Sequence, residues 1–227
     1  MPRKPRPVAP ETVYHVTLRC NNKELLIKTR KDLESVLCVV AHYKLEYKFK
    51  FYGYCVMNSH AHLVIETPAD EGATISKIMH DIALKYAKDY NLRHGRTGHF
   101  WGGRFKSPVV ESDSHGLNLL RYVSQNPVRA GMTDSPDAWE FSSFGVYKKG
   151  EPDAFIDLLP SFDGLSATRK RAAEMFVEYC GAMQEKQNDC WTMNYAVGTE
   201  SFIKKILRDN GLAPPWENGL AAADPPA

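Results

Sequence analysis

The sequence lacks any apolar run approaching the about 20 residues that a membrane-spanning helix requires. Its basic first residues, 1–7, are followed by no apolar segment, so they do not have the pattern of a secretory signal. Cysteine is also scarce, because the 227 residues include 5, an odd number, and no Cys-x-x-Cys pair. These absences argue against a zinc ribbon and a disulfide framework, and we expect a cytoplasmic protein without a membrane partner.

Neither sign of charge is in large excess, with 29 Lys and Arg against 27 Asp and Glu, but the distribution is uneven. Residues 1–150 carry 22 Lys and Arg against 15 Asp and Glu, whereas residues 151–227 carry 7 against 12. A basic body favours a polyanionic partner, although an ordinary solvated surface accounts for the same charges. With 43% hydrophobic and 25% charged residues, the composition is that of a globular protein.

Hydrophobic periodicity predicts strands and helices in alternation over the first two-thirds of the chain. We expect strands at 14–20, 47–57, 60–66 and 108–110, helices that begin after Thr29 and Thr74, and a third helix, capped by Asp113 or Ser114, that runs to Asn126. Pro127 is expected to end that helix. The β-α-β-β-α-β order indicates an α+β fold of the ferredoxin-like kind, an antiparallel sheet with helices on one face.

The composition divides the chain into three parts. Residues 1–10 hold four prolines and several cations and are expected to form an extended basic arm. Residues 11–159 contain the predicted sheet. Residues 160–227 are acidic, with helices expected around 166–184 and 199–211, and form a helical C-terminal extension.

His60 and His62 are two residues apart on a predicted strand, so both imidazoles project from the same face, about 6–7 Å apart at Cα. This spacing suits two ligands of one divalent ion. A pair of ordinary surface or core histidines gives the same pattern. Since both faces of the strand carry apolar residues, we expect another element to pack over the histidines.

Tyr122 and Asn126 are four residues apart on a predicted helix and therefore neighbours on one face. A phenol can attack phosphorus and form a phosphotyrosine, but its pKa near 10 means that it needs activation. A divalent ion held by two imidazoles and one carboxamide oxygen would polarise a phosphate beside it. Alternatively, Tyr122 is a packed aromatic and Asn126 only the residue that ends the helix.

Four separated motifs occur in order along the chain: His60-Ala-His62, Trp101-Gly-Gly-Arg-Phe105, Tyr122-Val-Ser-Gln-Asn-Pro-Val-Arg-Ala-Gly131 and Trp139-Glu-Phe-Ser-Ser-Phe144. Together they resemble the single-tyrosine HUH transposases of the IS200/IS605 type, most closely the REP-associated tyrosine transposases. The resemblance covers roughly residues 8–147. It implies metal ligands at His60, His62 and Asn126 and a nucleophile at Tyr122.

The resemblance further implies a bacterial enzyme that uses Mg²⁺ or Mn²⁺ to cleave and rejoin single-stranded DNA at hairpins through a 5′-phosphotyrosine. The sequence departs from the family's pattern at Gly102, where glutamine is common, and residues 160–227 match nothing in it. Gln125 is an alternative to Asn126 as the third ligand. A catalytically silent hairpin-binding protein and a hydrolytic phosphodiesterase remain alternative functions, and either a monomer or a homodimer is compatible with the family.

Single-stranded DNA binding requires cations for phosphates and flat groups on which bases stack. Residues 99–106 interleave both kinds, and further cations flank the predicted nucleophile or lie on the arm. The aromatic residues would equally serve as core. The predicted DNA-binding residues are Arg3, Lys4, Arg6, Trp101, Arg104, Lys106, Arg121 and Arg129.

Overall fold

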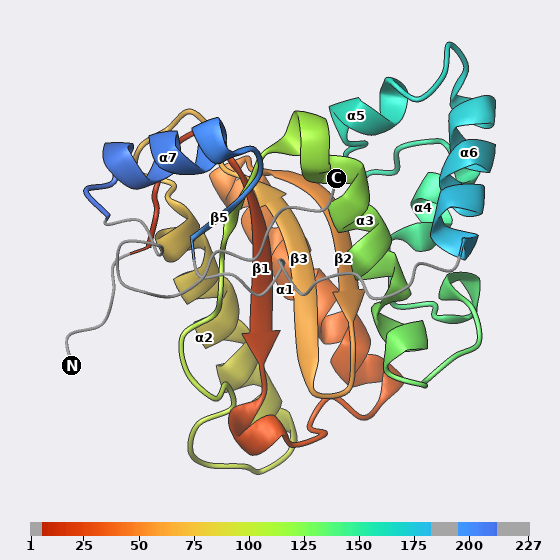
Figure 1. The fold of residues 1–227 in the computed structure, drawn as a ribbon. Helices are drawn as coiled ribbons and strands as arrows, with labels where there is room; N and C mark the ends of the chain where they lie inside the picture. Colours follow the sequence, from red (N-terminus) through yellow and green to blue (C-terminus); the bar gives the residue numbers. More distant parts are fainter. Residues whose placement is uncertain (1–5, 183–194, 213–227) are drawn as a thin grey trace.

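A five-stranded sheet with the strand order β2-β3-β1-β4-β5 forms the centre of the molecule (Figure 1). The computed structural model describes residues 6–182 and 195–212. The strands are β1 (Val13–Arg19), β2 (Lys50–Val56), β3 (His60–Glu66), β4 (Val109–Val110) and β5 (Ala196–Val197). All pairings are antiparallel except β4 with β5, which is parallel. The first four strands have the order expected of a ferredoxin-like core, which confirms the predicted α+β fold.

Helices cover both faces of the sheet, and not one face as the sequence suggested. In Figure 1, α1 (Arg30–Tyr47) and α2 (Ile75–Arg93) lie behind the strands, whereas α3 (Ser112–Arg129) crosses in front. The reason is visible in β3, where the residues from Ala61 to Ile65 are all buried although successive side chains point to opposite faces. The element expected over the histidines is therefore α3.

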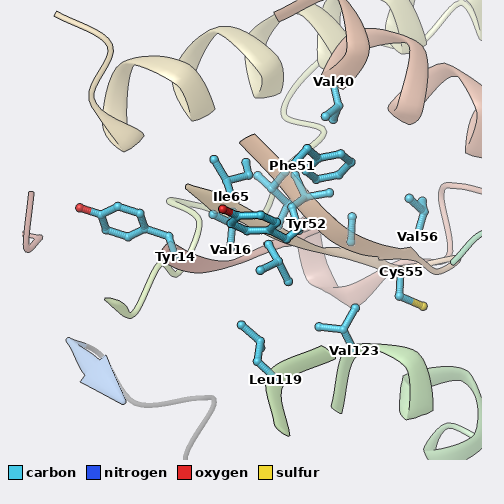
Figure 2. Close-up of a cluster of buried hydrophobic side chains, with 14 of the residues drawn as sticks. Tyr14, Val16, Val40, Phe51, Tyr52, Cys55, Val56, Ile65, Leu119 and Val123 are labelled. Atoms are coloured by element: carbon cyan, nitrogen blue, oxygen red, sulfur yellow. The ribbon is translucent and has the colours of Figure 1, made fainter. Parts of the chain in front are cut away.

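Apolar side chains seal both interfaces between sheet and helices. Figure 2 shows Val40 of α1 approaching the sheet from one side and Leu119 and Val123 of α3 approaching from the other. All three are buried, with exposed fractions at or below 1%. Gly53 brings α3 close, because a Cβ at this position would lie 2.9 Å from Leu120 Cδ2.

The predicted start of the second strand at residue 47 is wrong, because α1 continues to Tyr47 and β2 begins at Lys50. The Tyr43 and Tyr47 rings stack one helical turn apart, with centroids 5.9 Å from each other. Lys48 then adopts a left-handed conformation, and its N–H donates to the Lys44 carbonyl oxygen at 2.8 Å. A short alternation of aromatic and basic residues did not distinguish this helix end from a strand.

Both predicted ends of the third helix also differ from the structure. The N-cap is Glu111 and not Asp113 or Ser114, and the helix passes through Pro127 to Arg129. Proline removes only its own N–H from the helix ladder, and the Ala130 N–H still donates to the Asn126 carbonyl oxygen at 3.0 Å. As a result, residues 122–129 lie on one continuous helix.

The remaining elements follow α3 along the chain. They are α4 (Phe144–Lys149), α5 (Pro160–Asp163), α6 (Arg169–Gly181) and α7 (Glu200–Asp209), together with the short 3₁₀ turns at Asn21–Lys23 and Pro136–Ala138. The helices expected around 166–184 and 199–211 are thus confirmed as α6 and α7. Phe176 of α6 packs on Tyr147 and Phe162, with ring centroids 5.2 and 5.9 Å away. The division near residue 160 stays a prediction.

Both edges of the four strands β2-β3-β1-β4 are paired further. At one edge, β5 pairs with β4, so that the Glu111 N–H donates to the Val197 carbonyl oxygen at 2.9 Å. At the other edge, the Val56 N–H donates to Phe141 and the Ser143 N–H donates to Tyr54, both at 2.9 Å. These contacts satisfy edge groups that would otherwise be open to pairing. Within the described ranges, no helix is both long and apolar enough to span a membrane.

Candidate active site

Strands β1 and β3 and helix α3 bring the candidate site residues together. Thr17 is the cross-strand partner of His62, and Arg19 is the partner of His60, so these four side chains share the face of the sheet that α3 covers. The two imidazoles of His60 and His62 lie 5.0 Å apart at their ring centroids and are nearly perpendicular, at 78°. The predicted pair of histidines is therefore a real cluster beneath a helix.

His62 lies in the interior, with 3% of its surface exposed. Its Nδ1 atom is 2.9 Å from Nε2 of His15 and 3.4 Å from the hydroxyl oxygen of Thr17. Its Nε2 atom is buried and has no hydrogen-bond partner among residues 6–182 and 195–212. The ring is thus held through one nitrogen, and the other nitrogen is left for a ligand.

His60 is partly buried at the end of the same strand, and its Nδ1 lies 2.9 Å from the Ser59 hydroxyl oxygen. Burial, together with the positive charge of Arg19, lowers the pKa of His60 to about 4. Burial, followed by the neighbouring His15 and His60, also holds the pKa of His62 well below its usual value. Both imidazoles are therefore neutral at pH 7, which is the form that binds metal ions.

Tyr122 projects from α3 onto the histidine cluster and is 7% exposed. Its ring meets His62 edge to face, with centroids 5.8 Å apart at 88°, and meets His15 similarly, at 5.6 Å and 79°. The Arg129 guanidinium carbon lies 5.1 Å from the centroid of the Tyr122 ring. The phenol is consequently surrounded by imidazoles and a cation, and not by aliphatic side chains alone.

Asn126 and Gln125 differ in what their side-chain amides do. The Asn126 amide nitrogen donates to the Tyr122 carbonyl oxygen at 2.8 Å, which leaves its Oδ1 as the atom with ligand character. The Gln125 amide nitrogen donates to the Cys180 carbonyl oxygen at the end of α6, at 2.6 Å. This geometry favours Asn126 over Gln125 as the third ligand, which stays a prediction.

The residues present fit a divalent metal ion. In the part of the chain that the structure describes, no group of three or more His, Cys, Asp and Glu residues has metal-binding geometry. The proposed ligand set of two imidazoles and one amide contains only two residues of these four types, so that result does not bear on it. Nε2 of His62 is buried without a partner among the described residues, and Ser59 contacts Nδ1 of His60, so each histidine has one ring nitrogen for coordination.

The predicted DNA-binding residues lie in several environments. Arg3 and Lys4 lie outside the described residues. Arg6 stacks on Phe105, 3.7 Å from guanidinium carbon to ring centroid, and donates to the Phe105 carbonyl oxygen at 2.6 Å. Burial and the nearby charge of Arg104 lower the pKa of Arg6 to about 10. Arg6 thus joins the arm to the loop that contains the other candidates.

Trp101, one of the predicted DNA-binding residues, packs against α2 and Phe100. Its indole N–H donates to the Ala83 carbonyl oxygen on α2 at 2.9 Å, and its ring contacts Phe100 and Tyr86 at centroid distances of 4.6 and 5.6 Å. Arg104 and Lys106, on the same loop, are exposed. The loop therefore presents Arg104 and Lys106 to solvent and packs Phe100 and Trp101 against α2.

Arg129 and Arg121, both on α3, differ in their exposure to solvent. Arg129 is exposed beside Tyr122, whereas Arg121 is 1% exposed and donates to the Ala182 carbonyl oxygen. The Arg121 guanidinium carbon also lies 4.5 Å from the centroid of the Tyr179 ring. Because phosphate binding needs a cation that DNA can reach, Arg121 no longer belongs to the predicted DNA-binding set.

The sequence interpretation missed His15. Its side chain is 1% exposed and contacts both His62 and Tyr122. Alternation along β1 puts His15, Thr17 and Arg19 on one face, and antiparallel pairing with β3 makes it the face of the histidines. The alternation of side chains along β1 can be seen in the sequence, but the register that pairs β1 with β3 cannot.

Comparison with known proteins identifies the family of this chain. The family model for IS200-like transposases matches residues 9–126, which includes all four predicted catalytic and metal-binding positions. The chain belongs to the IS200-like transposase family.

Two individual proteins are similar to the chain. A protein of Haemophilus influenzae, provisionally named a REP-associated tyrosine transposase, is 25% identical over 113 residues, which is 46% of this chain and 64% of that protein. The match thus covers less than two-thirds of the relative's length. A solved structure of a REP-associated tyrosine transposase bound to a REP hairpin aligns with a TM-score of 0.56 and 18% identity, covering 69% of this chain and 92% of the other. That alignment shows the shared fold.

Proposed function

We propose that this protein cleaves single-stranded DNA at hairpin sequences and transfers the cut strand through a phosphotyrosine at Tyr122. The observation that carries this proposal is the contact of the Tyr122 ring with His62, 5.8 Å between centroids, beside a second neutral imidazole. A nucleophile, two potential metal ligands and a surface cation thus meet within one chain. Membership of the IS200-like transposase family supports the same reaction class.

The metal would be held by His60, His62 and Asn126. When bound, Mg²⁺ or Mn²⁺ supplies Lewis-acid polarisation of the scissile phosphate. The strand β3 fixes the two imidazoles, and α3 fixes the amide and the phenol one helical turn apart. Burial holds the imidazoles neutral, with a pKa of about 4 at His60, so proton competition would weaken metal binding only in acid.

In the chemical step, the Tyr122 oxygen forms a bond to phosphorus while the bond between phosphorus and the 3′ oxygen breaks. The phenol loses its proton, and the departing strand end gains one to become a 3′-hydroxyl. Because the phosphotyrosine retains the phosphodiester linkage, the reverse attack by a 3′-hydroxyl rejoins strands without ATP. The Arg129 guanidinium beside the ring offers a positive charge to the phosphate near the nucleophile.

For DNA binding, the exposed cations of the loop, Arg104 and Lys106, and Arg129 of α3 are the candidates for phosphate contacts. The structural neighbour was solved with a REP hairpin, which supports hairpin DNA as the substrate class. Since Tyr122 contacts the histidines of its own chain, we infer a site completed within one protomer.

The test is incubation of the full chain with labelled hairpin oligonucleotides and Mn²⁺, followed by denaturing electrophoresis. We expect a covalent protein–DNA adduct that Tyr122→Phe abolishes. The matched control is Tyr43→Phe on α1, on the opposite side of the sheet, which should leave the adduct unchanged. Hairpin binding without any adduct in the wild type would instead support the catalytically silent protein, and an adduct that survives Tyr122→Phe would refute the nucleophile.

A further inference from the structure

His15 is a buried histidine that the proposed chemistry does not yet use. It lies on β1, diagonally across the strand pair from His62, and its own cross-strand partner is Val64. Its ring stacks on that of His62, with centroids 5.2 Å apart and planes 15° apart, and its Nε2 lies 2.9 Å from His62 Nδ1. The contact is therefore a nitrogen-to-nitrogen hydrogen bond of ordinary length within the interior.

A hydrogen bond between two neutral imidazole nitrogens needs one N–H and one lone pair. If His15 donated, His62 would carry its proton on Nε2, which is buried and has no acceptor among the described residues. If His62 donates from Nδ1, its Nε2 carries a lone pair that a cation can use. In the second arrangement the remaining ring proton lies on His15 Nδ1, which is also buried, so burial alone does not distinguish the two arrangements. The second is selected because it is the form that metal-binding histidines adopt.

Thr17 does not explain this preference by itself. Its hydroxyl oxygen is 3.4 Å from the same Nδ1 atom, at the long end of hydrogen-bond distances, and a hydroxyl can act as donor or acceptor. The His15 nitrogen, at 2.9 Å, is the closer of the two partners of this atom. The edge contact between His15 and Tyr122 ties the same ring to the nucleophile.

We propose that His15 is a positioning residue that accepts the Nδ1–H of His62 and so keeps His62 Nε2 available to a divalent cation. This inference rests on the proposed function, because it assigns a role in the same metal site. In many metalloproteins a carboxylate or carbonyl oxygen accepts the corresponding N–H, whereas here a second imidazole does so. The role predicts an effect on metal affinity that exceeds any effect on folding.

The first experiment measures Mn²⁺ affinity of the full chain from the free Mn²⁺ signal in electron paramagnetic resonance. His15→Phe keeps a ring but removes the acceptor, and we expect affinity to fall by about 10- to 100-fold. His15→Gln, whose amide oxygen can reach the position of Nε2, should restore most of it, whereas the shorter His15→Asn should not. Thr17→Val is the matched control and should change affinity less than His15→Phe does.

The second experiment reads the His62 tautomer without metal, from long-range proton–nitrogen NMR correlations of the histidine rings. We expect the wild type to carry the His62 proton on Nδ1 and His15→Phe to shift it toward Nε2. An unchanged tautomer and unchanged Mn²⁺ affinity in a folded His15→Phe protein would overturn the inference. Equal losses of affinity in His15→Phe and His15→Gln, with matching losses of thermal stability, would also overturn it in favour of packing.

The two experiments separate this inference from the proposed function. If the wild type binds no Mn²⁺, the metal-dependent reaction fails, while the tautomer measurement still decides whether His15 orients His62. If the wild type binds Mn²⁺ through His60 and His62 but His15→Phe binds equally well, the proposed function stands and the role of His15 falls.

Discussion

The two faces of the central sheet are built for different purposes. On the face covered by α1 and α2, β3 contributes Ala61, Leu63 and Ile65, all fully buried and apolar. On the face covered by α3, the same strand contributes His60 and His62, in contact with polar or ionisable side chains from β1 and α3. One strand thus contributes apolar core on one side and the histidines of the proposed site on the other, because its side chains alternate.

The comparison teaches where burial is useful. On the apolar face, burial stabilises the fold through the hydrophobic effect. On the histidine face, burial lowers the pKa of His60 and His62 and keeps both imidazoles neutral, which is the form that binds metal ions. Helix α3 does both at once, since Leu119 and Val123 pack on the sheet while Tyr122 reaches the histidines.

The largest expected effect comes from the histidine face. His62→Ala removes a proposed ligand, and we expect cleavage to fall by about 10³-fold, since charge stabilisation by a metal is worth several kcal/mol. Hairpin binding should change little, because phosphate contacts come from Arg and Lys. Cleavage assays and binding titrations on the same preparation check both statements. Retention of full Mn²⁺-dependent cleavage would contradict the assignment.

The opposite face gives the complementary result. Ile65→Ala opens a cavity at a position that is 0% exposed, and we expect the free energy of unfolding to drop by about 2–5 kcal/mol. The Mn²⁺ affinity of the folded fraction should remain that of the wild type. Denaturant unfolding and Mn²⁺ titration measure the two quantities. A selective loss of metal binding at full stability would show that the two faces are not separable.

A smaller effect is expected where α1 and α2 meet, at Asp32. This carboxylate accepts hydrogen bonds from Thr29 N–H at 3.1 Å and Arg93 at 3.1 Å, and lies 2.8 Å from His94. Burial alone would raise the pKa of Asp32, but the bonds from His94 and Thr29 outweigh it and lower the pKa below 3.8. Asp32→Asn should cost about 1–3 kcal/mol of unfolding free energy at pH 7.

The sign of the pH dependence follows from that direction. Because the folded pKa lies below the unfolded one, the stabilisation is fully present above pH 3.8 and is lost as the pH falls through the folded value. The difference between wild type and Asp32→Asn should therefore shrink in acid. Urea unfolding at pH 7 and pH 3 checks this, and a difference that grows in acid would contradict it.

The smallest effect is expected at the surface of the site. Arg129→Gln should weaken hairpin binding a few-fold and reduce the slope of affinity against salt by about 1. Lys85→Gln on α2 is the control, since Lys85 lies on the helix layer behind the sheet and pairs with Asp89 at 2.9 Å. Fluorescence anisotropy at several salt concentrations measures both variants. Equal slopes for Arg129→Gln and wild type would place the DNA elsewhere.

Local patterns predicted much of this architecture. The capping threonines at positions 29 and 74 begin their helices as expected, and His60 and His62 share a face because strand alternation requires it. What depends on long-range contact was not predictable in the same way. His15 reaches His62 because of the register between β1 and β3. Arg121 is buried, and its side chain donates to the carbonyl oxygen of Ala182, 61 residues further along the chain.

Pro127 illustrates a different limit. A proline is a sound local signal for the end of a helix, yet α3 continues for two residues beyond it. Packing of Leu119, Tyr122 and Val123 on the sheet holds the helix in place, and tertiary contacts of this kind override local preference. The spacing of Tyr122 and Asn126 was nevertheless correct, because both precede the proline.

The hydrogen bonds that hold α3 in place bear on which chain supplies the site residues. The side chains of Arg121 and Gln125 donate hydrogen bonds to carbonyl oxygens at the end of α6. The segment between α3 and α6 is hydrogen-bonded to β2 through the backbone of Phe141 and Ser143. These bonds, like the contact of Tyr122 with His62, join residues of one chain. The candidate site is thus assembled from side chains of a single chain, which is the arrangement that we propose for the reaction.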